Sequence, residues 1–405
     1  MNKRLRGVRD NKITYFHNIR GMTYKNRRLT RKIHLNMRVI TVLFVIGQAF
    51  SAELHSTSRL ETALSSKCAI RKLYSEYKQT HGHTRPPHEE KLRLDMFERE
   101  IREILELRNN PGITWDVGVN LMADMTNGEK DLMLGVNGSV LANSNPRPRL
   151  KAMDPTKSIP VAFNFWRDEN LVGDVRKQLK GSCWAHASTG VIQALLAARS
   201  GNLDELSVQE VYDCADDVKL VRYGGFMDKG FDYPINNGRM GFEVDSPETP
   251  APGGSGTDCK TYKNKRNALA GYKVTNREGL EATDNDLRYH VCYVSPVAAN
   301  IGTKADQLDK YKGKLYTPQN CGDRADHSIV VIGYTRDTYI IKNSWGLEWG
   351  TGGYMNWDRN GKTCFLLNYM MVAYMEPKDG SEDKSSSWDR LWPFNWGSKK
   401  RTMIE

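Results

Sequence analysis

Residues 178–188 read QLKGSCWAHAS, and small and apolar residues continue from there toward Arg199. Gly181 and Ser182 suit a turn, and the residues after them suit a buried helix that begins near Cys183. A cysteine at a helix start faces free N–H groups and the positive end of the helix dipole, which favour thiolate over thiol. A lone cysteine is usually an inert core residue. This placement favours a nucleophile without excluding that alternative.

Two apolar runs downstream predict a β-hairpin. The first occupies residues 329–334, just after His327, and the second occupies residues 338–342, just before Asn343. A short turn between them brings His327 and Asn343 to the same end of the hairpin. A neutral imidazole can take the proton of a nearby thiol, and a side-chain amide can accept from the other ring nitrogen. Together with Cys183, these residues predict nucleophilic catalysis.

The formal net charge of +11 is concentrated at the amino terminus. Residues 1–36 carry eleven lysines and arginines and one aspartate, whereas the chain from Ser158 onward carries 31 basic and 32 acidic residues. Nucleic acid is therefore not an expected partner of the folded body. An apolar fraction of 39% fits a globular chain and excludes collagen-like, largely disordered and polytopic membrane proteins.

Residues 37–51 have the parts of a secretory signal peptide. A basic flank precedes an apolar core at residues 39–46, and small residues precede a cleavage site after Ser51. The core is shorter than the roughly 20 residues that span a bilayer, so no stable membrane anchor is expected. A buried strand or an uncleaved anchor is the alternative. Residues 1–36 are then interpreted as an over-extended gene model or a dispensable tail. The rival interpretation is a transit peptide or a nucleic-acid-binding arm.

A charged helical segment precedes the main body. From Glu89 to Arg108, side chains spaced by three or four residues share one helix face, which on spacing alone fits an ordinary amphipathic helix. A Gly-x-Asn-x-Met-x-Asp motif follows at residues 118–124. Residues 136–157 are loop-like, with a glycosylation sequon at Asn137, and they are a plausible cleavage site. The residues on the helix face are Glu89, Arg93, Phe97, Glu100, Ile104 and Arg108.

Over residues 66–377 the chain resembles the papain-like cysteine proteases, specifically the cathepsin L-like branch. His327 lies 144 residues after Cys183, inside the spacing of about 130–150 residues that is typical of this family. The matching motifs are GSCWA at 181–185, LSxQExxDC at 206–214, Gly224-Gly225, Cys321-Gly322, Asp326-His327 and Asn343-Ser344-Trp345-Gly346. The resemblance implies an α+β papain-like fold with a helical lobe, a β-rich, barrel-like lobe, and a helical propeptide before them.

The resemblance also implies a role for each matching residue. Cys183 would be the nucleophile, His327 the general base and later acid, and Asn343 the residue that orients the imidazole. Gln178 would donate to the oxyanion together with the Cys183 backbone N–H. Gly224 and Gly225 would bind the peptide backbone of the substrate. Phe226 and Met227 would lie near an apolar S2 pocket that favours a hydrophobic P2 side chain. Trp345, also among the substrate-binding positions, would shield the His–Asn hydrogen bond. No cofactor and no metal are implied.

These observations divide the chain into successive parts. The expected parts are a basic extension (1–36), a signal peptide (37–51), an inhibitory propeptide (52–157), a peptidase domain (158–377) and a linker with an aromatic tail (378–405). The tail fits a docking or self-packing peptide, or one that is cleaved off. The expected protein is a monomeric zymogen of a cysteine endopeptidase, secreted or lysosomal/vacuolar. It would act on protein or peptide substrates and be inhibited by its own propeptide; the alternative is a catalytically weakened papain-fold binding or inhibitory protein.

Several positions depart from the family pattern. Lys180 stands where a cysteine is usual, and residues 221–223 lack that cysteine's usual partner, so one disulfide is missing. The stretch 178–183 is one residue short, which leaves the reach of Gln178 open. His186 replaces an aromatic residue, either as a core filler or as a second titrating group. Glu100 and Arg108 stand where asparagines are usual. The resemblance implies the disulfide pairs Cys214–Cys259 and Cys321–Cys364. Cys292 is expected to be a buried free thiol, and Cys68 is expected to be free.

Overall fold

The computed structural model describes residues 56–82, 85–136, 156–215, 224–250, 258–279, 283–304 and 307–379. The chain divides into two compact units, residues 1–84 and 85–405. The segments expected at 1–36 and 37–51, the sequon at Asn137 and all but the first two residues of the tail 378–405 lie outside the described residues.

The described residues of the first unit form two helices, α2 (Thr57–Leu64) and α3 (Lys67–His81). The Ser66 hydroxyl accepts the backbone N–H of Ala69 at 3.1 Å and caps the start of α3. The helix ends at Gly82, whose φ of 62° lies in the left-handed region that favours glycine.

The second unit begins with the helix that the three- and four-residue spacing predicts. This helix, α4 (Glu90–Asn109), buries Arg93, and Arg93 Nη2 binds Glu129 Oε1 at 2.7 Å. Glu129 also closes a capping box with Thr126 at the start of α5 (Asn127–Leu132). The strand β1 (Asp116–Val117) pairs with β4 (Tyr311–Gly313) and joins this amino-terminal part to the rest of the unit.

A helical lobe follows, built around α8 (Cys183–Ser200). The helix begins at Cys183, as the sequence predicts, and ends at Gly201 with a φ of 74°. Most of its side chains are buried because α10 and α9 pack on one side of it and β6, β3 and β9 on another. The other helical elements are η1 (Pro87–Glu89), α7 (Phe165–Asp168), α9 (Val208–Cys214), α10 (Met227–Asn237), η3 (Glu243–Asp245), α11 (Cys259–Tyr262), α12 (Asp284–Tyr293) and η4 (Leu308–Lys310).

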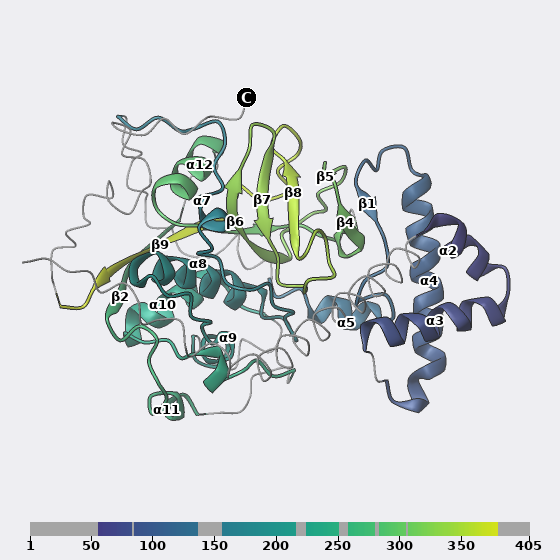
Figure 1. The fold of residues 1–405 in the computed structure, drawn as a ribbon, viewed down its shortest axis with the longest axis horizontal. Helices are drawn as coiled ribbons and strands as arrows, with labels where there is room; N and C mark the ends of the chain where they lie inside the picture. Colours follow the sequence, from purple (N-terminus) through teal and green to yellow (C-terminus); the bar gives the residue numbers. More distant parts are fainter. Residues whose placement is uncertain are drawn as a thin grey trace, which may run out of the picture. The chain divides into compact units, whose positions relative to one another are not determined.

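The β-rich lobe is a seven-stranded sheet in the order β2-β9-β3-β6-β7-β8-β5 (Figure 1). The central strand β6 (His327–Tyr334) is buried along its whole length, in keeping with its unbroken apolar run. It pairs antiparallel with β7 (Thr338–Lys342), which is the predicted hairpin. The remaining strands are β2 (Tyr272–Gly279), β3 (Val297–Ile301), β5 (Leu315–Tyr316), β8 (Tyr354–Asp358) and β9 (Met370–Pro377).

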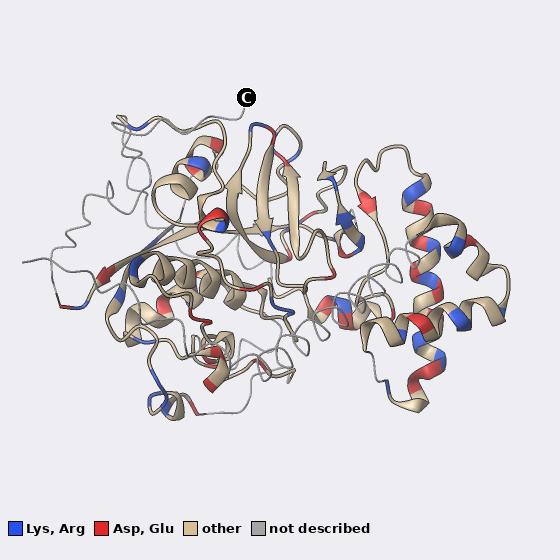
Figure 2. Ribbon diagram, in the orientation of Figure 1, with Lys and Arg blue, Asp and Glu red and all other residues tan. Residues whose placement is uncertain are grey.

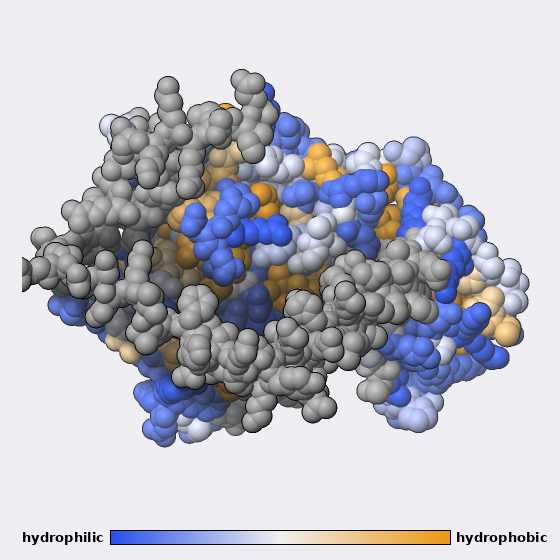
Figure 3. Space-filling view, viewed as in Figure 1, coloured by the Kyte–Doolittle hydropathy of each residue, from blue (hydrophilic) through white to orange (hydrophobic). Residues whose placement is uncertain are grey.

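Charged side chains are distributed differently over these elements. Lysine, arginine, aspartate and glutamate follow one another along α4, whereas α8 and β6 are almost free of them (Figure 2). On the face drawn in Figure 3, hydrophobic areas are interrupted by hydrophilic ones. The exposed large apolar side chains lie on separate segments: Leu92, Leu132, Val161, Leu179, Val244 and Leu347.

A buried ion pair stabilises the helical lobe. Glu210 is 0% exposed, and its Oε1 accepts Arg239 Nε and the Tyr233 hydroxyl, both at 2.8 Å. Glu210 Oε2 accepts Arg239 Nη2 at 3.1 Å. Removal of the carboxylate would leave the Arg239 guanidinium buried without its counter-charge.

We predict that Glu210→Ala lowers the free energy of unfolding by about 3–5 kcal/mol, as is typical when one partner of a buried pair is removed. Equilibrium urea unfolding measures this change. The matched control is Asp245→Ala, which breaks an exposed pair with Arg266 and should leave the unfolding midpoint nearly unchanged. An unchanged midpoint for Glu210→Ala would contradict the prediction.

Candidate active site

Cys183 lies at the first position of α8 and is fully buried. Ser182 occupies the N-cap position, but its side chain does not cap the helix, so the helix N–H groups next to the sulfur are not used by it. The sulfur accepts a hydrogen bond from the backbone N–H of Gly135 at 3.3 Å. Cys183 therefore sits in the environment that the sequence predicts, with a second segment of the chain against it.

His327 and Asn343 meet at one end of the β6–β7 hairpin. The imidazole Nε2 and the Asn343 Oδ1 are 2.8 Å apart, and because the amide oxygen can only accept, Nε2 carries the proton. The Trp345 ring lies over the imidazole with its centroid 4.4 Å away. Among the described residues, the buried His327 Nδ1 has no hydrogen-bond partner. This nitrogen is free to act as a base.

Burial shifts the pKa values of Cys183 and His327, as expected for an occluded site. Burial raises the pKa of the Cys183 thiol to about 11, although hydrogen bonds from Ser328 and Gly135 oppose the rise. Burial lowers the pKa of the His327 imidazole to about 4, although the hydrogen bond to Asn343 opposes the fall. Thiol and imidazole are thus both neutral near neutral pH in this state.

Gln178 reaches the site although residues 178–183 are one residue short. Its Nε2 donates to the carbonyl oxygens of Met133 and Lys180, both at 2.7 Å. Its Oε1 accepts the Ser344 hydroxyl, and its backbone N–H donates to the Ser344 carbonyl, again both at 2.7 Å. Two bonds to Ser344 therefore fix Gln178 beside the strand end that carries Asn343.

Residues 133–136 occupy the space in front of Cys183. The Gly135 carbonyl accepts the Gly225 backbone N–H at 2.9 Å, and the Val136 N–H donates to the Asp326 carbonyl at 3.2 Å. Backbone donors and acceptors on both sides of the site thus bind one extended segment. The segment takes up the hydrogen bonds that another peptide would need there.

Glycines allow this close approach. A Cβ atom on Gly135 would lie 2.3 Å from the Gly181 carbonyl oxygen and 2.9 Å from the Cys183 sulfur. A Cβ atom on Gly224, whose φ is 126°, would lie 2.2 Å from the Gly135 carbonyl oxygen. No side chain fits at either position without movement of the backbone.

The other expected substrate-binding residues lie next to these glycines. Gly225 lies against the Trp184 ring, and a Cβ atom on Gly225 would lie 2.5 Å from a carbon atom of that ring. Phe226 is the N-cap residue of α10 and is half-buried, and Met227 is the first residue of that helix and is fully buried. The start of α10 therefore carries two apolar side chains directly beside the backbone that binds Gly135.

The cysteines pair as the family resemblance implies. Disulfides join Cys214 to Cys259 and Cys321 to Cys364. The free cysteines in the described part of the chain are Cys68, which is exposed, and Cys183 and Cys292, which are buried.

Lys180, which stands in place of a cysteine, is almost fully buried. Its Nζ donates to Gln209 Oε1 at 2.7 Å and to the Thr249 carbonyl at 2.6 Å, and it lies 4.4 Å from the centre of the Tyr212 ring. Burial lowers the pKa of its ammonium group. A polar anchor therefore occupies the position of the missing bridge.

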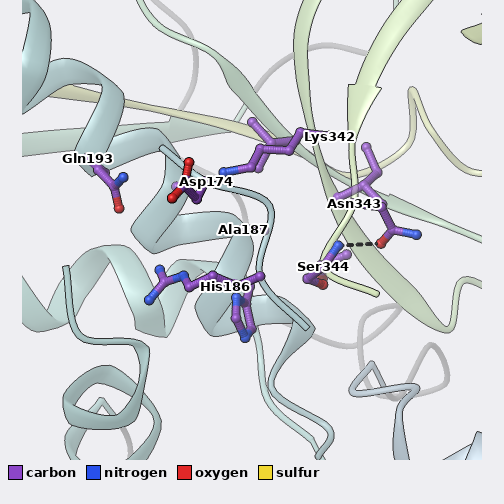
Figure 4. Close-up of a pocket in the computed structure, with 12 residues that line it drawn as sticks. Asp174, His186, Ala187, Gln193, Lys342, Asn343 and Ser344 are labelled. Carbon is purple, nitrogen blue, oxygen red and sulfur yellow. Dashed lines mark hydrogen bonds between the residues drawn. The ribbon is translucent and has the colours of Figure 1, made fainter. Parts of the chain in front are cut away.

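His186 is more than a core filler, because its Nε2 lies 2.9 Å from Glu248 Oε2. The sequence did not single out Glu248, which lies in a loop without periodic spacing, 62 residues from its partner. Only the unusual His186 and Lys180 hint at a buried acid nearby. His186 and Asn343 line one cavity of about 30 Å³ together with Lys342 and Ser344. Figure 4 shows these four side chains.

The two unusual positions on α4 also form polar contacts. Glu100 Oε2 accepts Lys130 Nζ at 2.7 Å, and the same Nζ donates to Asp309 Oδ2 at 2.7 Å. Burial raises the pKa of Glu100, whereas at Asp309 the charges and hydrogen bonds of Lys130 and Lys310 together outweigh burial and lower the pKa. Arg108 Nε donates to the Val117 carbonyl at 3.0 Å. The cluster links α4 and α5 to η4 of the β-rich lobe.

Within the described ranges, no group of three or more His, Cys, Asp and Glu side chains is arranged to hold a metal ion. None of the helices in the part of the chain that the structure describes is long and apolar enough to cross a bilayer.

Comparison with known proteins gives consistent matches. The family described as papain family cysteine protease matches residues 159–374. Ananain of Ananas comosus is 30% identical over 306 residues, which cover 73% of this chain and 84% of that protein. A cathepsin L-like proteinase of Phaedon cochleariae is 30% identical over 297 residues, which cover 70% of this chain and 87% of that protein.

Solved structures of proforms have the same fold. The ragweed pollen allergen Amb a 11, a cysteine protease in its proform, matches with a TM-score of 0.65 and 26% identity, over 78% of this chain and 96% of that one. Digestive procathepsin L 3 of the Tenebrio molitor larval midgut matches with a TM-score of 0.62 and 25% identity, over 75% of this chain and 99% of that one.

We predict that Gly135→Ala loosens residues 133–136 from the site. Overpacking costs about 1–3 kcal/mol, so alkylation of Cys183 by iodoacetamide in the full chain should become about 5- to 150-fold faster. The matched control is Gly128→Ala, whose Cβ would meet nothing closer than 4.0 Å. Equal alkylation rates in the two variants would contradict the prediction.

Proposed function

The chain belongs to the papain family of cysteine proteases and is a cysteine-type peptidase, and from this premise we propose that it is the zymogen of an endopeptidase that works through a thioester on Cys183. The observation that carries the proposal is the position of residues 133–136. Their backbone lies against the Cys183 sulfur and uses the Gly225 and Gln178 donors. Solved proforms in the family have the same fold.

Acylation would begin when His327 Nδ1 takes the proton of Cys183 Sγ. The sulfur forms a bond to the substrate carbonyl carbon, and the negative charge moves to the carbonyl oxygen. Gln178 Nε2 and the Cys183 backbone N–H would stabilise that oxygen. The C–N bond then breaks as His327 gives its proton to the departing amine, and the acyl group remains as a thioester.

Deacylation would use the same residues in reverse. His327 Nδ1 takes a proton from a water molecule, whose oxygen attacks the thioester carbon. The C–S bond breaks, the acid leaves, and the proton returns to the sulfur. Asn343 keeps the imidazole oriented through its bond to Nε2 in both halves of the reaction, and Trp345 shields that bond from water.

Substrates are proposed to be proteins or peptides bound in extended form. Gly225 would bind the substrate backbone as it binds Gly135, with Gly224 leaving room for that backbone. Phe226 and Met227 are apolar and lie beside that backbone, which supports a preference for a hydrophobic P2 side chain. The shortened stretch 178–183 motivates the alternative, a catalytically weakened binding or inhibitory protein. Gln178 nevertheless bonds within the site, which supports the peptidase.

We propose that residues 52–157 form the inhibitory propeptide and residues 158–377 the peptidase domain, with the tail 378–405 as an appended peptide. A signal at 37–51 would direct the protein to the secretory pathway, as a secreted or lysosomal/vacuolar monomer without cofactor. Residues 1–36 would not belong to the working enzyme.

We predict that the full chain, incubated at acid pH, hydrolyses a fluorogenic dipeptide with Leu or Phe at P2 and is labelled by a thiol-directed reagent. Cys183→Ala should lower kcat at least about 10³-fold. Gln178→Ala should lower it about 10²–10³-fold because one oxyanion donor is lost. Faster cleavage of a substrate with Glu at P2 would contradict the proposed pocket. Absence of cleavage after removal of residues 52–157 would contradict the proposed activity.

We predict that acid weakens the occlusion of the site. The pKa of His327 is about 4 in the occluded state and about 6.5 in an exposed imidazole. Between these values the open state binds a proton that the occluded state does not, so the occluded state loses stability as pH falls from 6.5 toward 4.

Amide hydrogen exchange at Gly135 in the Cys183→Ser full chain measures this effect. After correction for the intrinsic exchange rate, protection should decrease between pH 6.5 and 5. The decrease should be smaller in the Cys183→Ser, His327→Gln double variant, which lacks the titrating imidazole. Equal pH dependence in both proteins would rule out His327 as the group responsible.

A further inference from the structure

The stretch 178–183 carries both proposed oxyanion donors, Gln178 and the backbone N–H of Cys183. It is one residue shorter than the family pattern, and Lys180 stands where a bridging cysteine is usual. Both donors must nevertheless point at one oxygen, because the stabilisation of a developing charge depends on donors fixed in advance. Something other than a disulfide must hold this stretch.

Glu248 contacts the stretch at several points. Its Oε1 accepts the Ser182 hydroxyl and the Leu179 backbone N–H, the latter at 3.4 Å. Its Oε2 lies 2.9 Å from His186 Nε2, one turn into α8. The Glu248 and His186 side chains are 7% and 8% exposed. One buried carboxylate thus joins the residues on both sides of the Gly181 turn to the helix that carries Cys183.

Lys180 adds a second link to the same loop. Its Nζ donates to the carbonyl of Thr249, the residue after Glu248. Gln209 Oε1 accepts both Lys180 Nζ and the Thr249 backbone N–H, at 2.7 and 2.8 Å. The loop at residues 248–249 is therefore itself held in place from α9 while it holds the nucleophile stretch.

The charge of Glu248 is stable in this setting. Burial favours the neutral acid, but the charge and hydrogen bond of His186, with the hydroxyl of Ser182, outweigh it and lower the pKa of Glu248 to about 2. Because an ionised carboxylate only accepts hydrogen bonds, His186 Nε2 must be the donor. The contacts therefore persist over the pH range in which a peptidase works.

We propose that Glu248 is a positioning residue for catalysis, which fixes residues 178–183 so that the two oxyanion donors converge. The inference rests on the proposed function, since it concerns the donors of that reaction. Glu248 does not touch the substrate. Its loss would displace the donors, and a displacement of about 1 Å costs about 10²-fold in rate. Substrate binding along Gly224 and Gly225 lies on a separate segment and would be spared.

The test compares kcat and KM of the acid-processed full chain with those of Glu248→Ala and Glu248→Gln. Glu248→Ala should lower kcat about 10- to 100-fold with KM nearly unchanged, the pattern of an interaction needed in the transition state. Glu248→Gln keeps an oxygen that can accept from Ser182, so it should recover part of the loss. A purely structural role would instead lower the amount of folded enzyme and leave kcat per titrated active site unchanged.

The matched control is Asp245→Asn, a carboxylate on the same segment that pairs with exposed Arg266 and not with residues 178–183; its kcat should equal that of the wild type. If Glu248→Ala does not fold, Ser182→Ala and Glu248→Gln decide the matter. An unchanged kcat in both variants, or in a folded Glu248→Ala, overturns the inference while leaving the proposed function intact. A wild-type chain without hydrolysis overturns the proposed function, and the inference falls with it.

Discussion

The packing of α8 against β6 is the contact on which the site depends, because it joins the helix that carries Cys183 to the strand that begins with His327. In this contact Gly190 faces Val330, and a Cβ atom on the glycine would lie 3.6 Å from a valine methyl, which is an ordinary van der Waals distance. The register of β6 with β7 then sets Asn343 beside the imidazole. Two contacts between regular elements thus bring three residues together from positions 183, 327 and 343.

Residues 133–136 occupy the site that α8, β6 and β7 form. The backbone of residues 133–136 uses donors and acceptors that the framework already presents, and α4, α5 and β1 hold that segment through β4 and η4. Exclusion of water has an electrostatic effect as well as a steric one. Burial raises the pKa of Cys183 and lowers that of His327, and both shifts disfavour a pair of charged thiolate and imidazolium. The segment therefore both covers the nucleophile and keeps it un-ionised.

Local patterns were enough to predict the helix at Cys183, the hairpin between His327 and Asn343, and the buried face of α4, because each depends on residues close in sequence. The family resemblance supplied the pairing of Cys214 with Cys259 and Cys321 with Cys364. Contacts that depend on the path of irregular loops could not be predicted. Glu248 meets His186 across 62 residues of chain, and the reach of Gln178 in a shortened stretch depends on its two bonds to Ser344.

The polar anchor at Lys180 has a consequence for redox chemistry. A thiol nucleophile must stay reduced to react, and a disulfide three residues away would offer it a partner for exchange and would be open to the same reductants. The stretch around Cys183 is held instead by an ammonium group, an amide and a carboxylate, none of which can be reduced by thiols. The direct contacts that hold the geometry beside the nucleophile therefore contain no bond that a thiol reductant can break.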